Sequence, residues 1–367
     1  MNIRVVLLGV AGVLANALAF SQIPFDKEHW TIVGKMEKET YLGRDCIRLS
    51  EGALYSKDST FLNGSIEFDM VLSRNRYFPG FGFRVQNSEQ YEHIYLRPHQ
   101  LGNPDAIQYM PVYNGQEAWQ LYYGEGYSTA LTYPLEEWVH IRLLVKDTQA
   151  EVYVGSENKS RLIIHQLKRV TKPGRISLIN GGPIVARYAN VHYTKTDRPT
   201  FVGTFKPEPA PNPGVIPNWL ISSTFDEKVL GDSEGLPKSL MSNLTWQKCP
   251  TEVSGVINLS KISKLQARHT TVLAKITLTS DRAQIKKLQF GFSDKVRVYV
   301  NYQPVYEGHD RFASRDYRFL GTIGYFDAVF LDLKKGKNEI VLAITEEFGG
   351  WGVQAIMAEQ SGITIEP

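Results

Sequence analysis

Cysteine is scarce in this chain, whose 367 residues include only Cys46 and Cys249. Two cysteines cannot build the dense disulfide framework of small secreted domains. Because the two residues fall in different predicted domains, they either form one bridge between the domains or remain two buried thiols. Neither has histidine neighbours at the spacing of zinc ligands, which argues against a structural zinc site.

Sequence motifs of several enzyme classes are also missing. The chain has no Gly-x-Ser-x-Gly elbow, no glycine-rich phosphate loop and no His-Glu-x-x-His segment. It therefore gives no support to a serine hydrolase, a nucleotide-binding protein or a zinc protease. The formal net charge is only +3, with basic residues spread along the chain, so nucleic-acid binding is not indicated either.

Long apolar runs are confined to the N-terminus. Residues 1–21 begin with a single basic residue, Arg4, continue as VVLLGVAGVLANALAF and end in Ala19-Phe20-Ser21, a small-x-small pattern. These features are typical of a secretory signal peptide. No later segment approaches the ~20 apolar residues of a transmembrane helix. We therefore expect an exported protein, periplasmic or extracellular, without membrane insertion once residues 1–21 are removed.

Long segments of helical periodicity are lacking as well. Short alternating runs bounded by Gly, Asn, Asp and Pro fill both halves of the chain, and a period of two residues indicates strands. Between the halves, TDRPTFVGTFKPEPAPNPGVIPNW is rich in proline, which is typical of a stiff, extended linker. We predict an all-β fold, with an antiparallel β-sandwich at 22–195, a linker at 196–218 and a jelly roll at 219–367.

Aromatic, basic and amide side chains are concentrated between Tyr91 and Tyr123, in the segment YEHIYLRPHQLGNPDAIQYMPVYNGQEAWQLYY. Successive side chains of a strand point to opposite faces. Alternation along residues 91–99 therefore separates Tyr91, His93, Tyr95, Arg97 and His99 from Glu92, Ile94 and Leu96. A face that combines flat rings with guanidinium and imidazole groups is suited to stacking on sugars and bonding to their hydroxyl or carboxylate groups.

A pair of carboxylates, Glu67 and Asp69, lies on one face of a predicted strand at residues 65–72. The Glu-x-Asp pattern resembles the opening of the active-site segment of laminarinase-type glycoside hydrolases. Those enzymes carry a second catalytic Glu a few residues later, where this chain has Val71 and Leu72. One acid of the double-displacement mechanism is therefore missing, and an exposed polar pair on a sheet is the favoured interpretation.

Two blocks of sequence resemble known families. GFGFRVQNSEQYEHIYLRPHQLGNPDAIQYMPVYNG, with the later WQLYYGEGYS and EEWVHIRLLVKDTQAEVYV, resembles bacterial concanavalin-like domains of the laminin-G and 3-keto-disaccharide hydrolase-like group, over Phe25 to Thr194. FGFSDKVRVYVNYQPVYEG and FDAVFLDLKKGKNEIVLAITEEFGGWGVQAIM resemble galactose-binding-like jelly rolls attached to glycoside hydrolases of the β-galactosidase type, over Leu273 to Met357. These resemblances imply a glycan-binding module or an enzyme acting on oxidised disaccharides.

We predict that one sheet face of the first domain binds an oligo- or polysaccharide. The predicted ligand-binding residues are rings for stacking and polar groups for hydrogen bonding: Tyr95, Tyr109 and Trp119, with Arg84, Arg97, His99 and Gln108. Arg84 joins this face by regular alternation, which sets it opposite Phe81 and Phe83. Two or more arginines favour an acidic or oxidised glycan. Replacing an exposed Arg97 by alanine is expected to abolish binding with little change in melting temperature.

Two other functions remain open. In a glycoside-cleaving enzyme, a hydrolase or a lyase, His99 or Asp105 would be the base. Asp105 in the HQLGNPD loop is also a candidate calcium ligand, although a turn around Pro104 is the favoured interpretation, and no cofactor is required. The third reading is a structural or adhesive exported protein without a sugar ligand.

The second domain is expected to act as a further binding or docking module. Its candidate sugar contacts are Tyr302, Arg315 and Trp351. Because jelly rolls of this kind often serve as spacers, a core position for Trp351, between Gly350 and Gly352, is an equally open alternative.

Overall fold

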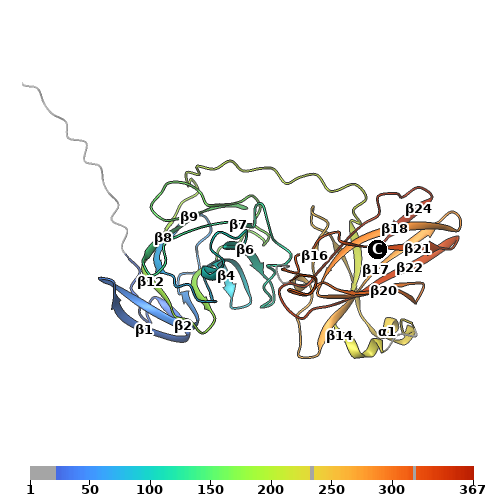
Figure 1. The fold of residues 1–367 in the computed structure, drawn as a ribbon, viewed down its shortest axis with the longest axis horizontal. Coiled ribbons are helices and arrows are strands. Elements are labelled where there is room, and N and C mark those ends of the chain that lie inside the picture. Colours follow the sequence, from blue (N-terminus) through green and yellow to red (C-terminus); the bar gives the residue numbers. More distant parts are fainter. Residues whose placement is uncertain (1–21, 232–234, 317–319) are drawn as a thin grey trace, which may run out of the picture.

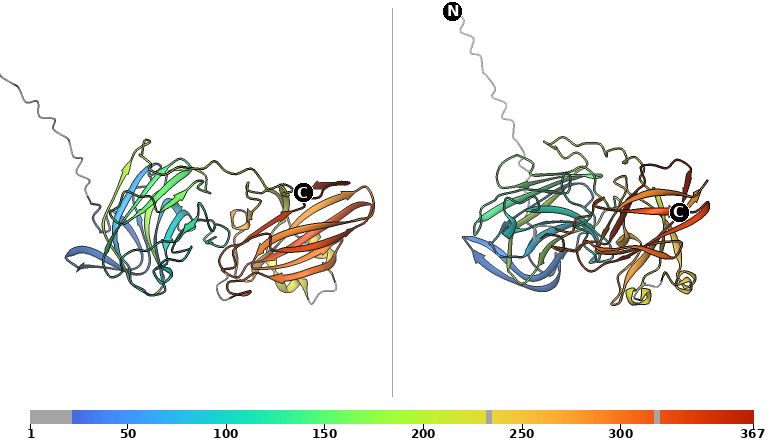
Figure 2. Two further views of the ribbon diagram at one scale, coloured as in Figure 1. Left: turned by 45° about the horizontal axis from the view of Figure 1, so that its top comes forward. Right: turned by 45° about the vertical axis from the view of Figure 1, so that its right-hand side comes forward.

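The computed structural model describes residues 22–231, 235–316 and 320–367, and the predicted signal peptide at 1–21 lies outside the described residues. Two β-rich lobes lie side by side and are joined by a long extended connection at residues 196–217 (Figure 1). The two further views in Figure 2 show the same division. Within the described part of the chain, no helix is long and apolar enough to cross a membrane.

The N-terminal lobe contains strands β1 to β12 and the short 3₁₀ helix η1 (Pro98–Gln100). The strands are β1 (Trp30–Tyr41), β2 (Arg44–Ser56), β3 (Gly64–Val71), β4 (Phe78–Asn87), β5 (Gln90–Leu96), β6 (Ile107–Val112), β7 (Ser128–Thr129), β8 (Trp138–Lys146), β9 (Gln149–Val154), β10 (Leu162–Ile164), β11 (Arg175–Gly181) and β12 (Ala186–Lys195).

These strands form one antiparallel sheet that folds over at β2. Residues 47–49 of β2 pair with β12, whereas residues 52–55 pair with β11. One layer therefore carries β10-β9-β8-β3-β12 and the other β11-β4-β5-β6-β7. Apolar side chains fill the space between them; the rings of Phe68 in β3 and Phe81 in β4 are 5.1 Å apart. The predicted all-β fold with antiparallel sheets is confirmed.

The C-terminal lobe contains strands β13 to β24, the helix α1 (Lys238–Asn243) and the 3₁₀ helices η2 (Glu227–Leu230) and η3 (Leu259–Lys261). The strands are β13 (Asn218–Ser222), β14 (Phe225–Asp226), β15 (Trp246–Pro250), β16 (Ile257–Asn258), β17 (His269–Ser280), β18 (Gln284–Ser293), β19 (Lys295–Val300), β20 (Gln303–His309), β21 (Asp327–Leu333), β22 (Gly336–Thr345), β23 (Gly352–Ile356) and β24 (Ile363–Glu366).

Two antiparallel sheets enclose the core of this lobe, one built on β15-β13-β17-β22-β19-β20 and the other on β16-β23-β18-β21. Large apolar side chains meet between them, including Trp219, Phe290 and Trp351, which are fully buried. The indole Nε1 of Trp351 donates a hydrogen bond to the carbonyl of Ile344 at 3.3 Å. Of the two positions that the sequence left open for Trp351, the structure shows the core position, so this side chain is not a sugar contact.

The two cysteines are both buried thiols. Cys46 lies in β2 of the first lobe and Cys249 in β15 of the second. Burial raises the pKa of both thiols. Of the two arrangements that the sequence left open, the structure contains the unbridged one.

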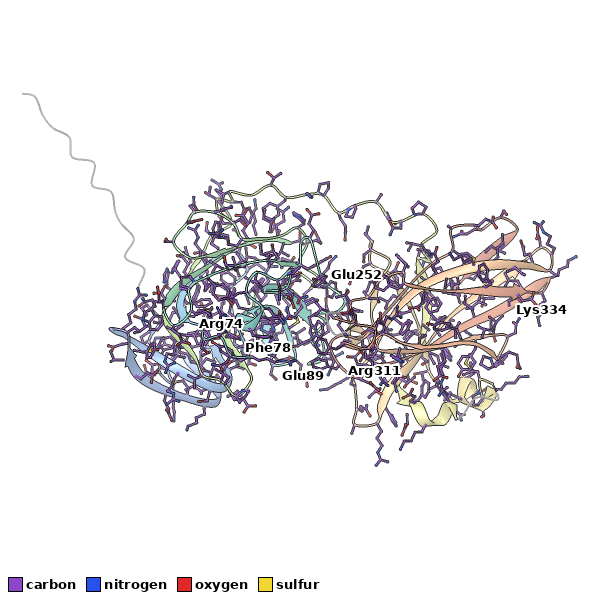
Figure 3. The ribbon with its side chains drawn as sticks, viewed as in Figure 1. Arg74, Phe78, Glu89, Glu252, Arg311 and Lys334 are labelled. Carbon is purple, nitrogen blue, oxygen red and sulfur yellow. The ribbon has the colours of Figure 1, made fainter. Side chains whose placement is uncertain are left out.

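The lobes touch through the segment that follows β6. Gln120 is central to the contact: its backbone N–H donates to the carbonyl of Gly349 at 3.0 Å, and its Nε2 donates to the carbonyl of Leu320 at 2.9 Å. Nearby, the Tyr122 hydroxyl donates to Glu252 Oε1 at 2.6 Å. Figure 3 shows Glu252 at the end of the C-terminal lobe that faces its neighbour. This contact brings loops of the second lobe over the outer face of β4 to β6.

Candidate functional site

A cavity of about 270 Å³ lies where the outer face of β4 and β5 meets the loops of the C-terminal lobe. Both lobes contribute to its walls. Its apolar side includes Phe78, Trp119, Phe312, Leu320 and Phe348. Its polar groups are Arg76, His93, Tyr95, Arg97, His99, Gln100, Asp105 and Glu117. The cavity thus combines aromatic rings with several hydrogen-bonding groups, in a volume near the lower end of ligand pockets, roughly 300 Å³.

The predicted alternation along β5 is confirmed for its first part. The ring of His93 lies between those of Tyr91 and Tyr95, with centroid distances of 5.5 and 5.3 Å. Ile94 and Leu96 point into the core. The strand ends at Leu96, however, because Pro98 begins η1.

His99 therefore lies on a 3₁₀ turn and not on a strand. It still lines the cavity, where the edge of its ring faces Phe78 with the centroids 5.6 Å apart. Burial lowers the pKa of His99, and the positive charges of Arg76 and Arg97 lower it further. The imidazole is therefore neutral at neutral pH, and its buried Nδ1 has no hydrogen-bond partner among the described residues.

His93 forms part of the cavity floor and is only 2% exposed. Neither ring nitrogen has a hydrogen-bond partner in the described part of the chain. The nearest carboxylate is that of Glu117, whose Oε1 lies 3.6 Å from Nδ1. Buried polar groups are normally hydrogen-bonded, so an unpartnered imidazole that faces a cavity is positioned to meet a ligand.

Arg97 is held rigidly in the wall. Its NH1 donates to the carbonyl of Asp105 at 2.8 Å and to Gln108 Oε1 at 2.7 Å, and its NH2 donates to the Tyr95 hydroxyl at 2.5 Å. The guanidinium also lies 5.7 Å from the centre of the Trp119 ring. Arg97 is thus a buried structural cation that shapes the cavity, in contrast to the exposed ligand group expected from the sequence.

Asp105 is the buried partner of this arginine. Its Oδ2 lies 3.5 Å from Arg97 NH1, and both side chains are almost fully enclosed. A carboxylate engaged in this way is poorly placed to act as a base. Residues 22–231, 235–316 and 320–367 contain no group of three or more His, Cys, Asp or Glu side chains that could hold a metal ion. Calcium binding at Asp105 stays a prediction that only a direct measurement can test.

Gln108 and Tyr109 lie on opposite faces of β6. Gln108 pairs across the ladder with Tyr95, and its Nε2 donates to the carbonyls of Trp119 at 2.8 Å and Tyr122 at 2.6 Å. It supports the cavity from behind. Tyr109 points into the core, where its hydroxyl donates to Glu92 Oε2 at 2.7 Å. Its predicted stacking role is corrected, because neighbouring residues of one strand cannot share a face.

Arg84 also lies away from the cavity. The pairing of β4 with β5 shifts register between Phe83 and Asn87, and Arg84 has a positive φ of 51°. This bulge turns the side chain inward, where Nε donates to the carbonyl of Leu62 at 2.9 Å and NH2 to Asn63 Oδ1 at 3.1 Å. The expectation from regular alternation is therefore wrong for Arg84.

Two candidates of the second lobe lie outside the cavity. Tyr302 occupies the hairpin between β19 and β20, and its ring faces Lys238 of α1 at 5.4 Å. Arg315 forms ion pairs with Asp310 at 3.2 Å and Asp327 at 2.6 Å. The structure therefore does not bring these two side chains to the residues of the first lobe.

Phe312 and Phe348 are cavity residues that the sequence did not reveal. Their side chains are 41% and 60% exposed, and their rings meet the buried Trp119 edge-on at centroid distances of 6.1 and 5.8 Å. Both belong to loops of the C-terminal lobe, remote in sequence from β5. The only local signal was a phenylalanine placed directly before two glycines at 349–350.

A second polar cluster occupies the outer face of the other layer. Nδ1 of His140 in β8 lies 2.8 Å from Asp69 Oδ1, and its Nε2 lies 3.4 Å from Glu67 Oε2. The contacts with Asp69 and then Glu67 raise the pKa of His140 to about 9. The contact with His140 also holds the pKa of Glu67 below its usual range. Glu67 and Asp69 thus contact a histidine and do not line the cavity; they form a polar pair on a sheet face, but Asp69 is buried and not exposed as expected.

We expect this cluster to make stability depend on pH. Because the folded pKa of His140 lies above its unfolded value of roughly 6.5, its contribution is fully present below that pH and is lost as pH rises through about 9. The side chain is 39% exposed, so solvent weakens the effect. Thermal unfolding should show a melting temperature that falls between neutral pH and pH 9.5. The fall should be smaller in His140→Gln, and an equal fall in that variant would contradict the assignment.

Comparisons with known proteins found similarity only at the level of structure. No protein-family model and no curated protein sequence matched this chain. Similar solved structures include a carbohydrate-binding module from Bacillus subtilis, 13% identical over 45% of this chain and 94% of the module, with a TM-score of 0.34. A β-glucanase from Bacillus licheniformis is 14% identical over 47% of this chain and 95% of its own, with a TM-score of 0.34. A Bacillus subtilis protein of galectin-like fold is 12% identical over 46% of this chain and 90% of its own, with a TM-score of 0.33.

Proposed function

We propose that this chain is an exported carbohydrate-binding protein and that the cavity between its lobes is the sugar site. The observation that carries the proposal is the unpartnered, buried His93 beneath a wall of exposed phenylalanine rings. Sugar rings place their apolar face on aromatic side chains and use their hydroxyl groups as hydrogen-bond donors and acceptors. The size of the cavity favours a short stretch of glycan.

In place of the second binding or docking module expected from the sequence, we propose that the C-terminal lobe helps to form the site of the first lobe. Phe312 and Phe348 complete the cavity of the first lobe. In this proposal the C-terminal lobe supplies part of one shared sugar site, and an intact contact between the lobes is needed for binding.

The proposal is tested by screening the full chain without residues 1–21 against a panel of glycans, once with calcium and once with a chelator. Recovered sugars are checked for cleavage. Binding of an intact glycan supports the proposal, and loss of binding in chelator would assign a metal to the site. A panel without any ligand would favour a structural or adhesive protein and overturn the proposal.

Phe348→Ala should weaken glycan binding about tenfold or more, because one stacking surface is lost. The side chain is 60% exposed, so the free energy of unfolding should change little. The matched control is Phe330→Ala, which removes a 68% exposed phenylalanine from β21, outside the cavity. Titration calorimetry measures glycan affinity, and equal affinities of the two variants would show that Phe348 does not contact the glycan.

One observation favours a second function. His99 is neutral at neutral pH and has an unpartnered buried Nδ1, as a general base requires. A glycoside-cleaving enzyme of the 3-keto-disaccharide type would then use His99, since Asp105 is engaged by Arg97. Shortened or altered sugars in the screen, absent with His99→Ala, would put this function first.

A further inference from the structure

Most charged groups of the cavity face an oppositely charged or titratable partner. The Arg97 guanidinium and the Asp105 carboxylate lie 3.5 Å apart and are both buried. Glu117 lies 3.6 Å from His93. Arg76, in contrast, is exposed at the cavity and forms no ion pair within the described residues. It is therefore a cation without a carboxylate, at a site already lined with sugar-compatible groups.

The surroundings of Arg76 also point to an anionic group of a ligand. His99 lies close enough for the charge of Arg76 to act on its imidazole, and the buried Nδ1 of His99 lacks a partner in the described part of the chain. Gln100, on the same turn, also lines the cavity. A planar guanidinium can bind a carboxylate through two parallel hydrogen bonds, which makes arginine well suited to this anion.

The cavity also contains a carboxylate beside His93. Glu117 is about half exposed and lies beside His93. A carboxylate there repels an anion and accepts hydrogen bonds from hydroxyl groups. Arg76 and Glu117 carry opposite charges, and together they would orient a ligand that has one acidic group and several hydroxyl groups.

We infer that the cavity selects an acidic sugar of the uronic acid class, with its carboxylate on Arg76 and its hydroxyl groups toward His93 and Glu117. The inference rests on the proposed function, because it names the substrate class of the same site. The ring of the sugar packs against Phe78 and Phe348, which line the same cavity.

The test compares two probes by titration calorimetry on the full chain without residues 1–21. One is a short oligogalacturonate, and the other is the same oligosaccharide with its carboxylates reduced to primary alcohols. The wild type should bind the acidic probe about tenfold more tightly or better, because a charge-assisted pair to Arg76 is lost with the reduced probe. Added salt should narrow the difference.

Arg76→Gln should erase the preference, so that this variant binds the acidic probe no more tightly than the reduced one. Arg74→Gln is the matched control, since it removes an exposed arginine two residues away that does not line the cavity (Figure 3). Glu117→Gln should strengthen binding of the acidic probe a few-fold. Loss of the preference in Arg74→Gln as well would indicate general electrostatic attraction and overturn the assignment to Arg76.

Different results would contradict the acidic-sugar inference and the proposed carbohydrate binding. If the reduced probe binds as well as the acidic one, or if Arg76→Gln keeps the preference, the acidic-sugar inference is wrong and carbohydrate binding stands. If neither probe binds while a neutral glycan of the panel does, the inference also fails alone. If no glycan of any kind binds, the proposed function fails and the inference fails with it.

Discussion

Arg97→Ala should destabilise the protein by about 3–5 kcal/mol and abolish ligand binding. Removal of one member of a buried ion pair leaves the other charge without compensation. This lowers the free energy of unfolding more than replacing both members by apolar residues does. Here the Asp105 carboxylate would lose its partner in an enclosed site, and the Tyr95 hydroxyl and Gln108 Oε1 would lose a donor. Urea unfolding followed by tryptophan fluorescence measures the change in the free energy of unfolding.

The control for this variant is Arg76→Gln, at an exposed arginine of the same cavity. Its free energy of unfolding should stay within about 0.5 kcal/mol of the wild type. The double variant Arg97→Ala/Asp105→Asn should recover part of the loss, because the uncompensated charge is gone. An Arg97→Ala protein with unchanged stability would instead restore the view of an exposed, purely ligand-binding arginine.

The sequence predicted those parts of the site that depend on local alternation. Tyr91, His93 and Tyr95 share a face because each is two residues from the next on a regular strand, and their rings contact one another in that order. The all-β fold followed from the same period-2 pattern and the absence of long helical periodicity. These are short-range properties, and they need no knowledge of distant partners.

Local irregularity explains the errors within the first lobe. One bulge at Arg84 reverses the direction of its side chain, and the residue with the positive φ is an arginine and not a glycine, so the sequence does not mark the bulge. Tyr109 follows a simpler rule, since the choice of Gln108 for the cavity face already assigns Tyr109 to the core. Arg97 is buried because it packs against Trp119 and Asp105. The alternation of side chains along a strand does not predict such contacts.

Long-range contact explains what was missed. Phe312 and Phe348 reach the cavity only because the lobes dock through Gln120, and the sequence predicted an extended linker without an orientation. Trp351 is only three residues from Phe348 in the sequence, but it lies in the core. The sequence alone therefore could not tell which of the two aromatic side chains faces the cavity. The cavity is thus a property of the contact between the lobes, and disturbing that contact should remove it.

Gly349→Ala should therefore weaken ligand binding about tenfold or more. Gly349 accepts a hydrogen bond from the Gln120 N–H, and an added Cβ would lie 2.6 Å from both Trp119 Cζ2 and Gln120 Oε1. Both neighbours are buried, so the loop that carries Phe348 must move away from the first lobe. Overpacking of this kind costs about 1–3 kcal/mol. Calorimetric titration measures the affinity, and thermal unfolding shows whether the two lobes still melt together.

Gly336→Ala is the matched control, because it separates backbone strain from the clash. The two glycines have similar positive φ values, 104° and 91°, but a Cβ at Gly336 meets no atom within 4 Å. Lys334, two residues before Gly336 in the sequence, lies at the end of the lobe opposite the contact (Figure 3). Its alanine variant should lose stability through strain and keep full affinity. If both variants bind equally well, the docking of the lobes does not form the site; if only Gly349→Ala loses affinity, the contact between the lobes is what creates it.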